Sequence, residues 1–77
     1  MSKLITMLRK SAEADKAKAL LSLDLLDKSA VGIGDHSTED FYKNAEEALL
    51  LLAESQDRLE AIEIYLGESN NPKELLT

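Results

Sequence analysis

Apolar and small residues recur along two stretches of the chain at an alternating spacing of three and four residues. This is the spacing of one face of an α-helix that packs against another helix. The first set is Met1, Ile5, Leu8, Ala12, Asp15, Ala19, Ser22 and Leu26. The second set is Phe41, Ala45, Ala48, Leu52, Ser55, Leu59, Ile62 and Leu66. Neither glycine nor proline interrupts residues 2–29 or 38–66, so we predict two helices with about these bounds.

The two sets mirror each other along the chain. When Leu26 is placed opposite Phe41, the residue numbers of every facing pair add up to 67. This symmetry predicts an all-α fold in which an antiparallel two-helix hairpin turns around residues 31–34. The whole chain, residues 1–77, is then a single helical-hairpin domain.

Asp15 is the one charged residue in this seam between the helices. The predicted register places it opposite Leu52, and burial of an unpaired carboxylate costs several kcal/mol. We therefore expect Asp15 to reach solvent or meet a cation; otherwise the register is wrong.

The ends of the second helix carry recognisable signals. Ser37 or Thr38 is a suitable N-cap, and Gly67 follows the last apolar residue, where we expect a glycine with positive φ to end the helix. Pro72 is typical of a first helical position, so we expect a short C-terminal helical turn at about residues 72–76.

Further apolar residues lie outside the seam, and a single hairpin has no use for them. They form the candidate oligomer interface: Met7, Ala14, Leu21, Leu25, Leu50, Leu51, Ile64 and Tyr65. Exposed apolar stripes of this kind normally mark an interface. We therefore predict a homodimer in which two hairpins form a four-helix bundle.

The composition excludes several functions. The net charge is −6, with a net +2 up to Ile33 and a net −8 from Gly34 onward, so we expect no binding to nucleic acid. The chain has no cysteine, which removes disulfides, thiolate catalysis and the common zinc frameworks. No signal-peptide h-region and no apolar stretch of transmembrane length is present. We expect a soluble cytoplasmic protein with no membrane partner.

Residues 32–40 hold the only histidine and several carboxylates. One interpretation makes Asp35, His36, Glu39 and Asp40 a metal site or an acid–base cluster. The other makes them helix caps beside Ile33, which plugs the end of the bundle. We favour the second, so these five residues are a candidate contact surface and no residue is assigned to catalysis, to a cofactor or to a metal.

Three segments of the chain are similar to a known family. They are Val31–Tyr42, the opening Leu4–Ala19, and Ala48-Leu49 followed by Asp57–Glu60. They resemble small uncharacterised proteins encoded by tailed phages of marine cyanobacteria (cyanophages). The resemblance implies a phage product that acts in the cytoplasm of the bacterial host cell or is packaged in the virion. It implies no activity and assigns no site.

These observations favour a non-enzymatic protein–protein interaction module that works as a homo-oligomer of helical hairpins and docks on a host or phage protein. The alternative is a structural or assembly component of a virion, whose purpose is its own oligomer. An enzyme or metal carrier would rest on the loop around His36 alone.

Overall fold

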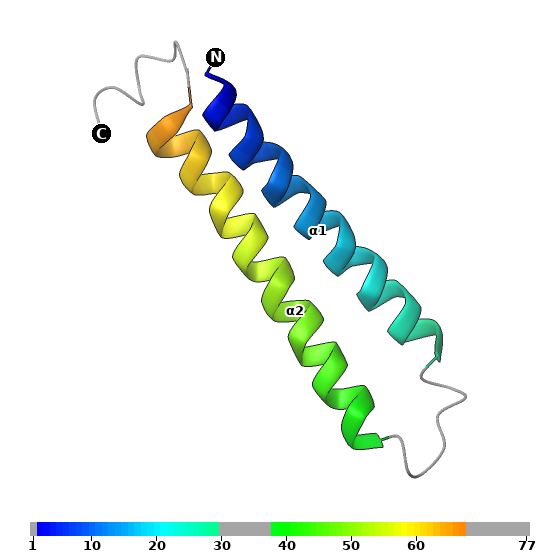
Figure 1. Cartoon of the computed structure of the whole chain (residues 1–77). Helices are drawn as coiled ribbons and strands as arrows, with labels where there is room; N and C mark the ends of the chain where they lie inside the picture. Colours follow the sequence, from blue (N-terminus) through cyan, green and yellow to red (C-terminus); the bar gives the residue numbers. More distant parts are fainter. Residues whose placement is uncertain (1, 30–37, 68–77) are drawn as a thin grey trace.

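The computed structural model describes residues 2–29 and 38–67, which form two long helices (Figure 1). Helix α1 is Lys3–Ser29, helix α2 is Thr38–Ala61, and η3, a π-helical turn at Ile62–Leu66, continues α2. The helices lie side by side and antiparallel, with the start of α1 beside η3 (Figure 1). No strand occurs in the described residues. The predicted all-α hairpin is confirmed for this part of the chain.

Three sequence predictions fall outside the described ranges. They are the turn at residues 31–34, the cap at Ser37 and the C-terminal helical turn at residues 72–76. The second helix does begin at Thr38, as predicted.

Helix α1 begins where a serine satisfies its free amides. The backbone N–H of Ile5 donates to the Ser2 hydroxyl oxygen at 3.0 Å, and the N–H of Thr6 donates to the Ser2 carbonyl at 3.1 Å. This is N-cap geometry, which typically stabilises a helix by about 1 kcal/mol. At the other end, Lys28 donates to Asp24 at 2.9 Å and places its positive charge near the negative end of the helix dipole.

The end of the second helix differs from the prediction. Gly67 has φ −66° and ψ 145°, an extended conformation rather than the left-handed one expected. A Cβ at this position would lie 2.9 Å from the carbonyl oxygen of Glu63, so glycine is needed here for close approach of the backbone and not for a positive φ. The π-helical turn also takes more residues per turn than an α-helix. Leu66, the last residue of the predicted seam, lies in this turn and is 47% exposed.

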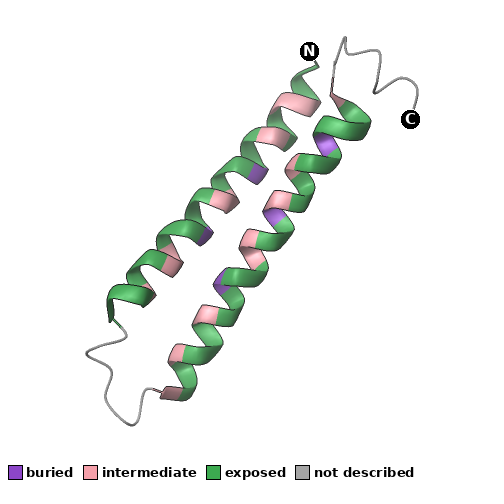
Figure 2. Ribbon diagram, turned by 180° about the vertical axis from the view of Figure 1, so that it is seen from behind, coloured by how far each residue is buried: buried purple, intermediate pink, exposed green. Residues whose placement is uncertain are grey.

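The buried residues, purple in Figure 2, lie on the sides of the two helices that face each other. In the described residues they are Ala12, Ala19, Ala48, Ser55 and Ile62, and all five belong to the predicted seam. Ser55 is fully buried, and its hydroxyl donates to the Leu52 carbonyl at 3.1 Å. Small residues thus meet in the middle of the hairpin, where they allow the two backbones to approach closely.

Asp15 meets a cation. The guanidinium of Arg58 donates to its carboxylate at 2.7 Å, across from α2 to α1. The Asp15 side chain keeps 29% of its surface exposed. The charge in the seam is therefore paired and partly exposed to solvent, which avoids the cost of an isolated buried carboxylate.

Candidate functional site

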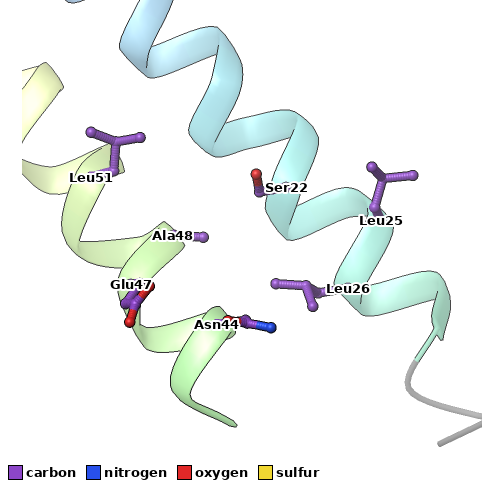
Figure 3. Close-up of a pocket in the computed structure, with 7 residues that line it drawn as sticks. All are labelled: Ser22, Leu25, Leu26, Asn44, Glu47, Ala48 and Leu51. Atoms are coloured by element: carbon purple, nitrogen blue, oxygen red, sulfur yellow. The ribbon is translucent and has the colours of Figure 1, made fainter. Parts of the chain in front are cut away.

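Among the residues that the structure describes, two clefts lie between the helices. The first, of about 530 Å³, is near the end of α1 (Figure 3), and its lining residues are Ser22, Leu25, Leu26, Asn44, Glu47, Ala48 and Leu51. The second, of about 200 Å³, is near η3, and its lining residues are Leu8, Ser11, Arg58, Ala61, Ile62 and Leu66. Both have mainly apolar walls.

Both clefts open on the same side of the hairpin. Residues three, four or seven apart share one side of a helix. On α1 the positions 8, 11, 15, 22 and 25 follow this spacing, and on α2 the positions 44, 47, 51, 58 and 61 follow it. Asp15 belongs to the α1 series and Arg58 to the α2 series, and their ion pair lies between the clefts. We call this side the cleft face.

Each helix presents a continuous row of side chains along the cleft face at alternating spacings of three and four. The α1 stripe is Leu4, Met7, Ser11, Ala14, Lys18, Leu21 and Leu25. The α2 stripe is Glu47, Leu51, Glu54, Arg58, Ala61 and Tyr65. The large apolar side chains stand near the ends of these rows, and Tyr65 is 80% exposed. Such an exposed apolar pattern indicates an interaction surface.

The predicted oligomer interface falls largely on these stripes. Met7, Ala14, Leu21 and Leu25 are exposed members of the α1 stripe, and Tyr65 is an exposed member of the α2 stripe. Leu51 is half-buried, because it already lines the first cleft. Leu50 and Ile64 are exposed but lie beside the α2 stripe rather than in it.

The opposite side of the hairpin is built differently. There Arg9 and Glu63 form a long ion pair at 3.5 Å, and both are on the far side of their helices from the stripes. Leu20, Tyr42 and Leu49 are exposed on this side, but they do not form a continuous apolar row. The apolar surplus is therefore concentrated on the cleft face.

The charges of the two helices are opposite in sign. Helix α1 has six cations and four anions, a net +2, whereas α2 with η3 has two cations and eight anions, a net −6. The hydrogen bond from Arg58 lowers the pKa of Asp15 below its ordinary value, and the charges of Arg58 and Lys18 act in the same direction against partial desolvation. Asp15 is thus held as an anion, and Lys18 remains a 71% exposed cation beside it, with its Nζ 4.0 Å from Asp15 Oδ1.

The candidate contact surface at the loop is described only in part. Glu39 and Asp40 are exposed in the first turn of α2, whereas Ile33, Asp35 and His36 lie outside the described ranges. Residues 2–29 and 38–67 contain no group of three or more His, Cys, Asp or Glu arranged to hold a metal ion. Within the same two ranges, neither helix combines the length and apolar character needed to cross a membrane.

Comparison with known proteins finds no match to a family model, a curated protein or a solved structure. The cleft face is therefore interpreted from its own geometry. Sequence reasoning did not include seven residues of the two stripes in the candidate interface: Leu4, Ser11, Lys18, Glu47, Glu54, Arg58 and Ala61. Their three-and-four spacing already places them in the same rows as the predicted residues. Such a row is hard to recognise in a sequence when polar residues occupy its middle.

Proposed function

We propose that the protein is a non-enzymatic protein–protein interaction module, of phage type, whose partner is a second copy of the same chain. In this homodimer the cleft faces of two hairpins pack together as a four-helix bundle. The observation that carries the proposal is the concentration of exposed apolar side chains and both clefts on one side of the hairpin.

The weakness of the hairpin's own core supports self-association. Ile62 is the only large apolar side chain buried in the described residues; the other four are alanines and a serine. Burial of an alanine methyl contributes on the order of 1 kcal/mol, against 1.5–3 kcal/mol or so for a larger apolar side chain. Chains of this size usually need a second source of stability, and cysteine is absent, so disulfides do not supply it. A second hairpin packed on the cleft face would cover the exposed apolar side chains of the first hairpin and supply this stability.

The size of the cleft face suits a stable dimer. Helix α1 has 27 residues, which gives a length of roughly 40 Å at 1.5 Å per residue. Two helices abreast are roughly 20 Å wide, so the face offers about 800 Å² per copy. This is the area that each partner contributes to a standard protein–protein interface.

The experiment is sedimentation equilibrium at micromolar concentration. We expect twice the chain mass of 8.5 kDa. A matched pair of variants then identifies the face: Leu25→Glu alters the α1 stripe, whereas Leu20→Glu makes the same change on the opposite side, and the two leucines are 55% and 48% exposed. We expect Leu25→Glu to sediment as a monomer and Leu20→Glu as a dimer.

Two outcomes contradict the proposal. A compact wild-type monomer at these concentrations means that the cleft face is covered by a foreign partner or by other residues of its own chain. Loss of the dimer in Leu20→Glu but not in Leu25→Glu means that the hairpins pair through the other side.

A further inference from the structure

We infer that the two hairpins of the dimer pair with their loop ends together, so that α1 of each copy lies along α2 of the other. This inference rests on the proposed homodimer and specifies its arrangement. The observations behind it are the opposite charges of the helices and the match between the two stripes at equal heights along the bundle.

Two symmetric arrangements bring one cleft face onto another. If the two-fold axis runs along the helices, α1 of one copy covers α2 of the other and both loops lie at the same end. If the axis crosses the helices, α1 covers α1, α2 covers α2, and the loops lie at opposite ends. Both arrangements use the same cleft face, so we compare the charges that each brings together.

The charge distribution favours the arrangement with the loops together. It sets α1, with net +2, against α2 and η3, with net −6. The other arrangement stacks the two acidic helices on each other along the whole interface. Complementary charges set the orientation of partners, and facing like charges are costly.

The existing contacts between α1 and α2 show which heights correspond. The residue numbers of the two cross-helix ion pairs add up to 72 for Arg9 with Glu63 and to 73 for Asp15 with Arg58. These sums exceed the predicted 67 by five and six, so the residues that meet across the hairpin come from further along both helices than predicted.

A two-fold axis along the helices keeps every residue at its height. Contacts between α1 of one copy and α2 of the other therefore follow the same rule as those within a copy. Residues of the two stripes whose numbers add up to 72 then meet across the interface, and the pairs are Met7–Tyr65, Ser11–Ala61, Ala14–Arg58, Lys18–Glu54, Leu21–Leu51 and Leu25–Glu47.

The chemistry of these pairs is complementary. Apolar side chains meet near both ends, and small ones meet at Ser11 and Ala61. Ala14 leaves room for the Arg58 guanidinium, which already holds Asp15. Leu25 meets the methylene stem of Glu47, whose carboxylate can extend into solvent.

The central contact joins Lys18 of one copy to Glu54 of the other. Both side chains are exposed in the single hairpin, and both belong to the stripes. The two-fold axis makes this pair occur twice in the dimer. It is therefore the contact that most directly distinguishes the two arrangements.

A charge exchange tests this contact. We expect Lys18→Glu and Glu54→Lys each to weaken dimerisation roughly tenfold, because two exposed ion pairs are lost and replaced by repulsion. The dimerisation affinity of the double variant is expected to recover to within about threefold of the wild-type value, by the same estimate. The control exchange, Lys10→Glu with Glu46→Lys, uses exposed residues outside both stripes and should leave the dimer unchanged, singly or together.

A distance measurement tests the position of the loop ends. Because the chain has no cysteine, a nitroxide can be attached uniquely to Ser29→Cys at the end of α1 or, as a control, to Ala17→Cys near its middle. Both residues are exposed. With the loops together, both labels give separations of about 15–30 Å, as expected for neighbouring and diagonal helices in a bundle.

The outcomes separate this inference from the proposed function. A short Ala17 distance with a Ser29 distance of about 40 Å or more leaves the dimer intact and overturns the shared loop end. The pairing of Lys18 with Glu54 is overturned if the double charge variant does not recover its dimerisation affinity while the control exchange leaves the dimer unchanged. A wild-type monomer in sedimentation removes the homodimer itself.

Discussion

Ile62 and Ile64 offer a direct test of where the core of the hairpin lies. They are the same residue type, two positions apart in the same π-helical turn. Ile62 is 6% exposed and lines the second cleft, whereas Ile64 is 56% exposed and lies outside the α2 stripe. The same substitution at both positions changes local helix propensity equally, so any difference in its effect comes from packing.

The expected difference follows from the exposed fractions. Ile→Ala removes three carbons, which are worth about 0.8 kcal/mol each when buried. At Ile62 nearly all of this, about 2.4 kcal/mol, is lost, and the cavity left behind raises the total to about 2.5–4 kcal/mol. At Ile64 less than half is lost, about 1 kcal/mol.

The assay is urea unfolding followed by circular dichroism at 222 nm, at one fixed chain concentration because the stability of a dimer depends on it. With a slope of about 1 kcal/mol per molar urea for a chain of this size, Ile62→Ala lowers the midpoint by roughly 2 M more than Ile64→Ala. Equal midpoints for the two variants, or a larger loss at Ile64, would falsify the assignment of Ile62 to the core.

Three further predictions concern other parts of the hairpin. Ala19 is fully buried and Ala17 is exposed on the same helix. We expect Ala19→Leu to lower the free energy of unfolding by about 1–3 kcal/mol through overpacking. Ala17→Leu should stay within about 0.5 kcal/mol of wild type, and urea unfolding measures both. Because the pKa of Asp15 is lowered in the folded state, its ion pair stabilises the fold above pH 4 or so and is lost as the pH falls through the folded pKa. Asp15→Asn should therefore lower the urea midpoint at pH 7 and have little effect at pH 2; an equal loss at both pH values contradicts the ion pair. A Cβ at Gly67 would lie 2.9 Å from the Glu63 carbonyl, so Gly67→Ala should speed amide exchange in η3, and unchanged exchange there contradicts the close approach.

The helices and their buried faces could be predicted because both follow from local spacing. Each buried residue of the described ranges, from Ala12 to Ile62, was in the predicted seam. The partner of Asp15 could not be chosen in this way, because Arg58 stands six positions from Leu52, the residue predicted opposite Asp15.

The details of the second helix's end were also beyond the sequence. Apolar spacing does not distinguish an α-helical from a π-helical turn over Ile62–Leu66, and a glycine after a helix is as compatible with close backbone approach as with a positive φ. The candidate interface was predicted as one set of residues. Leu50 and Ile64 lie beside the cleft face, whereas Lys18 and Glu54 lie on it, and this placement could not be predicted because a face is defined by two helices together.

The Asp15–Arg58 contact also bears on which hairpin the chain can form. A seam that repeats every seven residues allows, in principle, the two helices to slide past each other by one repeat and bury much the same side chains. In such a slipped hairpin the residue facing Asp15 in place of Arg58 is Leu51 or Tyr65, and neither carries a positive charge. The carboxylate would then lose its hydrogen-bonded partner on α2 and keep only the exposed Lys18 of its own helix, 4.0 Å away. One charged pair thus makes a single alignment preferable to its near-equivalents, a role that burial of alanine and serine alone does not perform.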